Sequence, residues 1–253
     1  MKIDRPKLIT FACSMYCEKA RWALDWHGIA YQEIGWPVGL HEILAKRHGA
    51  TATTVPILLD GDDVIQGSSS IIDWAERRSN ERSRILTVAG ARAIEQRADD
   101  VIGVHVRRLY FARMLPKYPG WAKPGLFQNM STSHHAIGNV MWPVAWRVVM
   151  RRYDVTPNAA AESRAILDNE LDWLGDQLAD NRQYLVGDRF SRADLTVASM
   201  FGAFACSEEL PGFNNVTFPD ELVADAARWK SHPVMRWVAE QYEAHRSPMR
   251  LAA

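Results

Sequence analysis

The pattern of apolar residues changes near residue 80, and this change constrains the fold more than any other feature of the chain. Before it, short apolar runs of strand length alternate with segments of helical periodicity; after it, only helical periodicity continues. Alternating strands and helices predict an α/β unit, whereas an unbroken series of helices predicts an all-α bundle. We therefore expect an α/β domain over residues 1–79, a polar linker over 80–90 and an all-helical domain over 91–253.

The first domain is predicted to begin with a βαβ unit and to continue with a β-hairpin and a helix. Its first strand runs into a helix with Ser14 as the N-cap residue and Gly28 as the residue that ends it. Asp60-Gly61 between two apolar runs is a strong hairpin signal. A parallel crossover followed by a hairpin makes a mixed sheet. The predicted elements cover residues 7–11, 14–28, 29–34, 40–48, 55–59, 64–65 and 68–78.

The second domain is predicted to consist of helices and one long loop. Residues 116–139 are rich in Pro, Gly, Ser and Asn, which predicts a loop, and loops of this length are commonly functional. Ser191 and Asp194 precede an apolar run with the spacing of a capping box, so a buried helix is expected to begin there. The predicted helices cover residues 91–115, 142–153, 159–178, 191–206, 219–229 and 233–245.

Composition excludes several classes of protein. The chain has 30 Lys plus Arg and 30 Asp plus Glu, so no net field attracts nucleic acid or an anionic membrane. Its three cysteines, Cys13, Cys17 and Cys206, are too few and too clustered for a disulfide framework. No apolar run is long enough to span a bilayer, and the first residues lack a secretory signal. We expect a cytoplasmic protein without nucleic-acid or membrane partners.

Pro56 stands at the start of a predicted strand, where a proline removes a donor from the hydrogen-bond ladder. It also restricts the backbone of the preceding residue, Val55. A cis peptide bond between the two residues would account for this placement, although only about 5% of X-Pro bonds in folded proteins are cis.

Four motifs, in this order, resemble those of the glutathione transferase superfamily, and the resemblance covers nearly the whole chain. Residues Cys13–Leu24 resemble the family's Ser/Cys-Pro-Phe/Tyr-Cys/Ser opening with its following Lys/Arg-x-Arg-x-x-Leu. Val55–Leu58 resembles its cis-proline strand, and Gly67–Trp74 its Glu-Ser-x-x-Ile-x-x-Tyr segment. Val186–Asp194 is similar to its capping motif in the helical domain. The resemblance implies a thioredoxin-like first domain, a helical-bundle second domain and a Ser/Cys-type active site.

The resemblance also implies roles for individual residues. Ser14 falls at the position of the family's catalytic Ser or Cys. The backbone of Val55, next to Pro56, falls where the cysteinyl part of glutathione pairs with the protein. Ser68 falls where a hydroxyl and a helix N-terminus hold the γ-glutamyl carboxylate. Glutathione is then the co-substrate, and a homodimer is the usual assembly of the family.

The chain departs from the family pattern at three places. Met15 replaces the usual proline after the catalytic position. Gly67 replaces the acidic residue or Gln that precedes the binding Ser, and Gln66, one place earlier, is available to substitute for it. Two cysteines stand in a Cys-x-x-x-Cys spacing on either side of Ser14 rather than in a Cys-x-x-Cys motif.

Transferase chemistry needs a thiolate, because the protonated thiol is a poor nucleophile. A hydroxyl of Ser14 at the helix N-terminus, beside unpaired N–H groups and a positive dipole end, can donate to the glutathione thiolate and lower its pKa. The alternative is that Ser14 serves only as an N-cap. Cys13 or Cys17 offers a different chemistry, a mixed disulfide with glutathione, and the alternative for Cys17 is a small, inert core residue.

The pocket for a second substrate is expected between the first helix of the second domain and the long loop. The helix contributes Tyr110, Arg113 and Met114 as candidate binding residues. An apolar, aromatic-rich cleft with a few cations suits a hydrophobic electrophile or an aromatic acid, and packing between domains is the alternative role of these residues. His134-His135 lacks a third ligand at suitable spacing, so no metal site is predicted.

Three functions remain open from the sequence. The first is conjugation of glutathione to a small hydrophobic electrophile, with Ser14 stabilising the thiolate, as in detoxifying transferases. The second is glutathione-dependent thiol–disulfide or isomerase chemistry through Cys13 or Cys17. The third is a transferase-fold binding protein without catalysis, which the replacements at Met15 and Gly67 favour.

Overall fold

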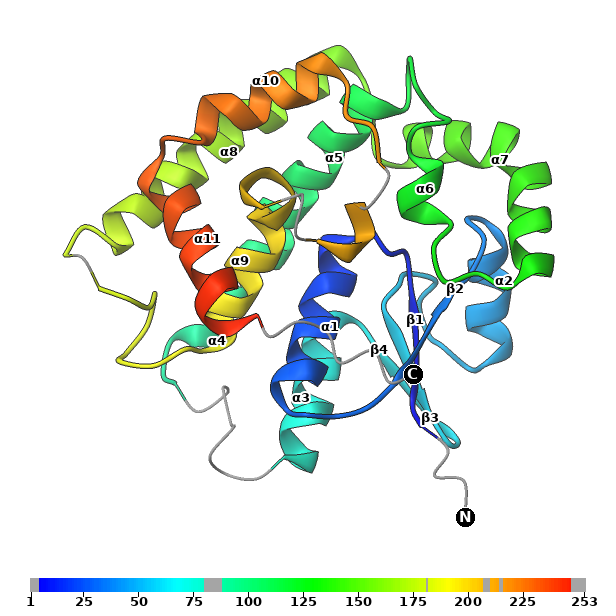
Figure 1. Ribbon diagram of the computed structural model, residues 1–253, viewed down its shortest axis with the longest axis horizontal. Helices are drawn as coiled ribbons and strands as arrows, with labels where there is room; N and C mark the ends of the chain where they lie inside the picture. The colour runs from blue at the N-terminus through cyan, green and yellow to red at the C-terminus, as the bar shows by residue number, and fades with distance from the viewer. Residues whose placement is uncertain (1–4, 80–87, 181, 207–209, 214–215, 247–253) are drawn as a thin grey trace.

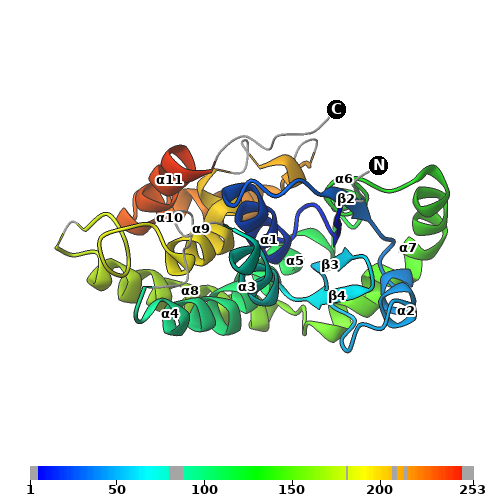
Figure 2. The same ribbon diagram turned by 90° about the horizontal axis from the view of Figure 1, so that it is seen from below.

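The computed structural model in Figure 1 describes residues 5–79, 88–180, 182–206, 210–213 and 216–246. Most of the predicted linker, residues 80–87, lies outside the described residues. The chain forms a mixed α/β region and a helical region that lie side by side (Figure 2). The predicted fold class, a thioredoxin-like α/β domain followed by a helical bundle, is confirmed.

The sheet has four strands in the order β2-β1-β3-β4. β1 pairs in parallel with β2 and antiparallel with β3, and β3 and β4 form the predicted hairpin, so the sheet is mixed. The second strand begins later than predicted, because Gly28, at φ 65°, and Ile29 instead close the preceding helix: the Ile29 N–H donates to the Leu24 carbonyl at 2.9 Å. The strands are β1 Lys7–Thr10, β2 Gln32–Gly35, β3 Ile57–Asp60 and β4 Asp63–Gln66.

Alternation of side chains in β1 gives the sheet two buried faces. Leu8 faces helices α1 (Met15–Trp26) and α3 (Ser68–Arg78), where Leu58, Ile71 and Trp74 complete one cluster. The next residue, Ile9, packs on the opposite face, toward α2 (Leu40–Arg47), in a cluster with Trp36, Ala45 and Ile57. The first domain is therefore a helix–sheet–helix sandwich.

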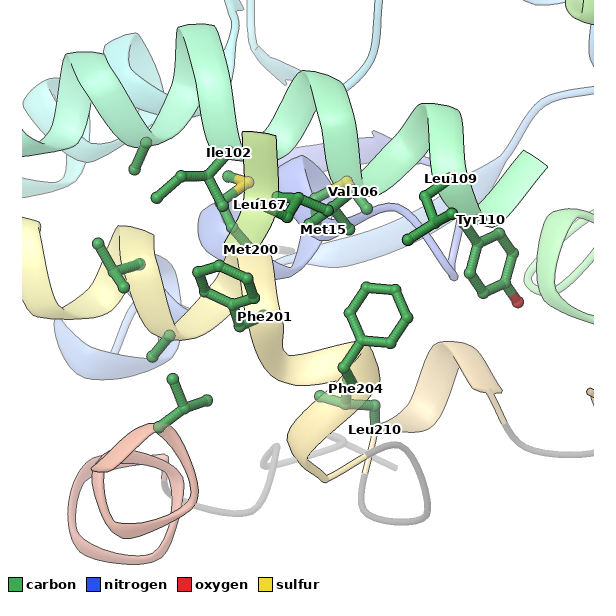
Figure 3. Packing of buried hydrophobic residues seen from close by; sticks show 14 of the residues in the cluster. Met15, Ile102, Val106, Leu109, Tyr110, Leu167, Met200, Phe201, Phe204 and Leu210 are labelled. Atoms are coloured by element: carbon green, nitrogen blue, oxygen red, sulfur yellow. The ribbon is translucent and has the colours of Figure 1, made fainter. Parts of the chain in front are cut away.

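The helical region is built around α9, whose residues are almost all buried. In Figure 3, Met200, Phe201 and Phe204 of this helix face Val106 and Leu109 of the first long helix of the domain. The capping box is confirmed, because the Asp194 carboxylate accepts from the Ser191 backbone N–H at 2.8 Å. The helices are α4 Ala91–Arg97, α5 Gly103–Met114, α6 Lys123–Leu126, α7 Thr132–Arg152, α8 Pro157–Gln177, α9 Arg192–Ala205, α10 Asp220–Trp229 and α11 Pro233–His245, with a 3₁₀ turn at Pro211–Phe213.

The predicted helix over residues 91–115 is interrupted by a π-helical turn, η2, at Ala98–Ile102. Within this turn the Asp99 carbonyl accepts a hydrogen bond from the Tyr16 hydroxyl at 2.7 Å. Gly103 follows, and a Cβ there would lie 2.5 Å from the Tyr16 hydroxyl oxygen. The turn is thus a place of close contact between α1 of the first domain and the helical domain.

The prediction of a long loop over residues 116–139 is wrong for residues 123–126 and 132–139, which are helical. The segment contains the short helix α6 and the first two turns of α7, whose N-cap Ser131 accepts from the His134 N–H at 3.2 Å. Pro124 lies in the first turn of α6, and two glycines of the segment mark close contacts: a Cβ at Gly125 would lie 2.8 Å from the Cys13 Cβ, and one at Gly138 would lie 3.1 Å from the Phe127 ring. Part of the segment packs onto the first domain: the Gly125 carbonyl accepts from the Cys13 N–H at 3.0 Å, and the Asn129 carbonyl accepts from the Gly35 N–H at 2.8 Å.

A buried ionic cluster joins the two domains. Lys19 of α1, fully buried, lies 2.9 Å from Glu95 of α4 and 2.7 Å from Asp99. Arg192 of α9, also fully buried, pairs with the same Glu95 and, at 2.8 Å, with Asp73 of α3. Breaking one member of such a cluster leaves an uncompensated buried charge, so the cluster holds α1 and α3 in register with α4 and α9.

Candidate active site

A cavity of about 420 Å³ lies between the two domains. Its floor comes from the β1–α1 turn and from residues 53–55, and its walls come from the start of α2, from α5 and from α7. Helices α2 and α7 lie side by side in both views (Figures 1 and 2). The lining is mainly apolar and aromatic and includes Phe11, Val38, Tyr110, Phe111, Trp142, Val149 and Tyr153.

Ser14 is half-buried at the start of α1 and lines the cavity. Its N–H donates to the Phe11 carbonyl and its carbonyl accepts from the Glu18 N–H, both at 2.9 Å, which fixes the turn into the helix. The hydroxyl does not cap the backbone of α1. The structure therefore places Ser14 at the cavity with a hydroxyl that the helix terminus does not use.

The cysteines beside Ser14 are confined by close backbone contacts. Cys13 donates its N–H to the Gly125 carbonyl at 3.0 Å, and a Cβ at Gly212 would lie 2.0 Å from the Ala12 carbonyl oxygen. Burial raises the pKa of the Cys13 thiol to about 12. It raises the pKa of Cys17, which is fully buried, to about 11. Both shifts favour the protonated thiol, which is a poor nucleophile; Cys13 is half-buried and lines the cavity, whereas Cys17 is fully buried.

The peptide bond between Val55 and Pro56 is cis. Val55 lines the cavity together with Thr53 and Thr54. Among the described residues, no backbone group hydrogen-bonds to the N–H or carbonyl of Val55. An extended ligand can therefore pair with this backbone as an added strand would.

Gln66 does not reach toward the binding position that the sequence assigns to it. Its side-chain oxygen accepts from the Ala52 N–H at 2.8 Å, and its side-chain nitrogen donates to the Ala52 carbonyl. These bonds hold the loop before Val55 in place. Gln66 thus stabilises the cavity floor, because its side-chain amide is occupied by the hydrogen bonds to Ala52.

Gly67 and Ser68 stand at the start of α3, beside the cavity rather than in its lining. Gly67 has φ 88° and donates its N–H to the Pro56 carbonyl at 3.0 Å, so the turn before α3 uses a conformation that favours glycine. Ser68 is the first residue of α3 and is buried. The helix N-terminus supplies free N–H groups at this point, an arrangement suited to a carboxylate.

Of the three candidates on α5, only one lies at the cavity. Tyr110 lines it, and burial raises the pKa of its hydroxyl well above the usual value. Arg113 instead pairs with Asp225 of α10 at 2.7 Å, and Met114 is fully buried in the core. Arg113 and Met114 follow Tyr110 by three and four residues and so start from the same side of α5, but the Arg113 side chain turns to Asp225 and Met114 enters the core.

The structure adds cavity residues that the sequence analysis missed. Arg107 lies one turn before Tyr110 and Phe111 on the same face of α5, so helical spacing was sufficient to find it. Trp142 of α7 and Tyr153, which follows the last residue of α7, stand at the two ends of the helix predicted over residues 142–153, and nothing local shows that they line a cavity. His41 of α2 also lines the cavity; its Nδ1 accepts from the Gly39 N–H at 3.0 Å.

Among the described residues, no group of three His, Cys, Asp or Glu side chains gathers as a metal site. The same part of the chain holds no helix that is both long and apolar enough to cross a membrane.

Comparison with known families agrees with the geometry of this site. Residues 8–83 match the model of the glutathione S-transferase N-terminal domain, and residues 157–230 match that of the glutathione S-transferase C-terminal domain.

The chain belongs to the glutathione transferase superfamily. No curated protein matches it. Among solved structures, a glutathione S-transferase of Ceriporiopsis subvermispora in complex with glutathione is 15% identical, with a TM-score of 0.64 over 98% of this chain and 99% of that one. A glutathione transferase of Phanerochaete chrysosporium is 16% identical, with a TM-score of 0.60 over 95% and 97%. A glutathione S-transferase of Methylobacterium radiotolerans in complex with glutathione sulfonate is 20% identical, with a TM-score of 0.51 over 92% and 93%.

Within this superfamily fold, the replacement of proline by Met15 has a packing role. Met15 is buried and reaches toward Val106 and Met200 of the helical domain (Figure 3). A proline ring would leave this volume unfilled, because it is shorter than the methionine side chain. The departure at this position therefore belongs to the contact between the two domains of this transferase homologue.

Proposed function

We propose that the protein is a glutathione transferase-like enzyme in which Ser14 stabilises the glutathione thiolate for attack on a small hydrophobic electrophile. One observation carries the proposal: Ser14 lines the cavity at the N-terminus of α1, and its hydroxyl does not cap the helix. A hydroxyl and a helix dipole aimed at a sulfur favour its charged form, because a preorganised donor stabilises negative charge without reorganising.

The rest of the floor supports glutathione as the co-substrate. The backbone of Val55, with no partner among the described backbone groups, offers an N–H and a carbonyl to the cysteinyl unit. The N-terminus of α3 at Ser68 offers N–H groups to the γ-glutamyl carboxylate. Solved members of the same fold hold glutathione or its sulfonate. Burial raises the pKa of both neighbouring cysteine thiols, which favours transfer over thiol–disulfide exchange.

In the proposed reaction the glutathione sulfur forms a bond to an electrophilic carbon, and the leaving group departs with the electron pair of the broken bond. The thiol proton goes to solvent when glutathione binds. The proposal also includes the family's usual homodimer and a cytoplasmic location. Sedimentation equilibrium on the purified chain tests the dimer: a single species of monomer mass would contradict it.

Replacement of the Ser14 hydroxyl is the decisive test. Ser14→Ala is expected to reduce kcat/KM with 1-chloro-2,4-dinitrobenzene about 10²-fold, as the loss of one charge-stabilising donor does. The titration of bound glutathione, followed by thiolate absorbance near 240 nm, should move to higher pH in this variant.

Two controls accompany this test. Ser70→Ala removes an exposed hydroxyl of α3 and should leave turnover unchanged. Cys13→Ser should also retain activity; a loss there as large as that of Ser14→Ala would favour cysteine chemistry. Retention on immobilised glutathione without turnover of any electrophile would instead identify a binding protein.

A further inference from the structure

Arg107 occupies an unusual place in the cavity wall. Its guanidinium carbon lies 4.3 Å from the centroid of the Tyr153 ring and 5.7 Å from that of Tyr16. Both distances are within the range of cation–π attraction. Two aromatic side chains from different helices thus hold the guanidinium at the cavity, which it lines.

Other arginines on or near this helix have carboxylate partners. Arg108 pairs with Glu162 at 3.5 Å, Arg113 with Asp225 at 2.7 Å and Arg97 with Glu170 at 2.8 Å. Arg107 forms no ion pair with any carboxylate of the described residues, and its Nε is buried there without a hydrogen-bond partner.

The missing partner has a physical cost. Guanidinium keeps its charge at any pH at which the protein folds, so it cannot avoid the cost by losing a proton. A buried donor left without an acceptor costs about 1–3 kcal/mol. Stacking on an aromatic ring uses the face of the guanidinium, whereas its N–H groups point outward in the plane. A carboxylate that meets two of these N–H groups side by side is the acceptor that fits this geometry best.

The cavity residues around Arg107 indicate which other chemical groups such a ligand contains. The other arginine of the lining, Arg152, is paired with Glu42 at 2.8 Å, so its charge is already balanced. The remaining wall near Arg107 is apolar and includes Tyr110, Phe111 and Val149. A ligand that fits both the Arg107 guanidinium and the apolar wall has one carboxylate and an apolar body.

We propose that Arg107 is a specificity-determining residue that selects apolar electrophiles bearing a carboxylate. The inference rests on the proposed transferase function for its kinetic test, but the binding preference itself does not require turnover. Substrates without the carboxylate are expected to enter the same cavity and to leave the Arg107 guanidinium without an acceptor.

The kinetic test compares 4-chloro-3-nitrobenzoate with its methyl ester in the wild type and in Arg107→Met. With either substrate the glutathione sulfur bonds to the chlorinated ring carbon, chloride leaves, and the thiol proton goes to solvent. The ratio of variant to wild type is taken for each substrate separately, so that the different reactivities of acid and ester cancel. We expect kcat/KM to fall about ten- to a hundredfold more for the benzoate than for the ester, mainly through KM, as loss of a charge-assisted bidentate pair does.

Arg108→Met is the matched control, because it removes the adjacent arginine of the same helix, which pairs with the exposed Glu162 and does not line the cavity. It should change the two substrates equally. Arg107→Lys keeps the charge without the planar fork and should retain part of the preference. An unchanged benzoate-to-ester ratio in Arg107→Met would overturn the proposal, and so would a raised KM for glutathione alone, which would assign Arg107 to the co-substrate.

A binding measurement separates this proposal from the proposed function. Trp142 lines the cavity, so its fluorescence reports ligands there. Quenching by 3-nitrobenzoate and by methyl 3-nitrobenzoate is measured without glutathione, in the wild type and in Arg107→Met of equal melting temperature. Tighter binding of the acid that is lost in the variant supports the role of Arg107 even if no conjugation occurs. Equal affinities for acid and ester in the wild type would refute it.

Discussion

At the scale of single residues, protonation of His41 in the cavity wall makes the free energy of unfolding depend on pH. Burial lowers the pKa of its imidazole to about 4, so the side chain is neutral in the folded protein at neutral pH. Between about pH 4 and 6.5 the unfolded chain binds a proton at this residue that the folded chain does not bind. The free energy of unfolding therefore rises with pH across this window, and acidification removes stability.

His41→Gln keeps an acceptor for the Gly39 N–H but does not titrate. Urea unfolding at pH 7 and at pH 5 should show that the wild type loses about 1–2 kcal/mol more than this variant on acidification. An equal loss in both proteins would mean that His41 is accessible to protons in the folded state.

The candidate site was predicted best where a motif fixes the backbone. Ser14 and Val55 stand at a strand–helix turn and before a proline, and both lie at the cavity. The partners of individual side chains could not be predicted from the sequence, because nothing local shows that Gln66 bonds to Ala52 or that Arg113 pairs with Asp225. Such partners are far apart along the chain, and only the tertiary fold brings them together.

At the scale of elements, the contact between β2 and the segment after α6 depends on a single glycine. Gly35 donates its N–H to the Asn129 carbonyl at 2.8 Å, and a Cβ at Gly35 would lie 2.2 Å from the Gln128 carbonyl oxygen. Gly35→Ala must push this backbone away, and we expect a loss of about 2–4 kcal/mol. Gly120→Ala is the control, because a Cβ at Gly120 meets nothing within 4 Å.

Thermal unfolding measures this difference, and hydrogen exchange locates it. Faster exchange over α6 and the start of α7 is expected in Gly35→Ala but not in Gly120→Ala. A melting temperature equal to that of the control would show that the segment after α6 moves to accept the added methyl group without loss of stability.

Element prediction succeeded where periodicity and caps agree and failed where composition was taken as a loop signal. The helix over 68–78 has an apolar face with Ile71, Ile72 and Trp74 buried, and the helix that follows Ser191 begins with a capping box. The segment 116–139 has many prolines and glycines, but Leu126 and Phe127 are buried within it, and the Phe127 ring packs on Trp142 of α7. Tertiary packing outweighs local propensity there.

At the scale of the whole molecule, the buried cluster around Lys19 determines how firmly the domains are joined. Lys19→Met leaves Glu95 and Asp99 buried with one cation fewer, and we expect a loss of about 3–5 kcal/mol in the free energy of unfolding. Arg78→Met breaks the exposed pair with Asp60 and should cost about 1 kcal/mol or less. Urea denaturation monitored by tryptophan fluorescence compares the two variants; similar losses would show that water reaches the cluster.

Two ionic contacts between the domains differ in their exposure to water. The cluster around Lys19 and Arg192 holds two fully buried cations, so ions in solution screen it little. At the cavity, Arg152 of α7 meets Glu42 of α2 in an ion pair whose side chains are 45% and 38% exposed. Added salt therefore weakens the contact between α2 and α7 and leaves the buried cluster largely unchanged.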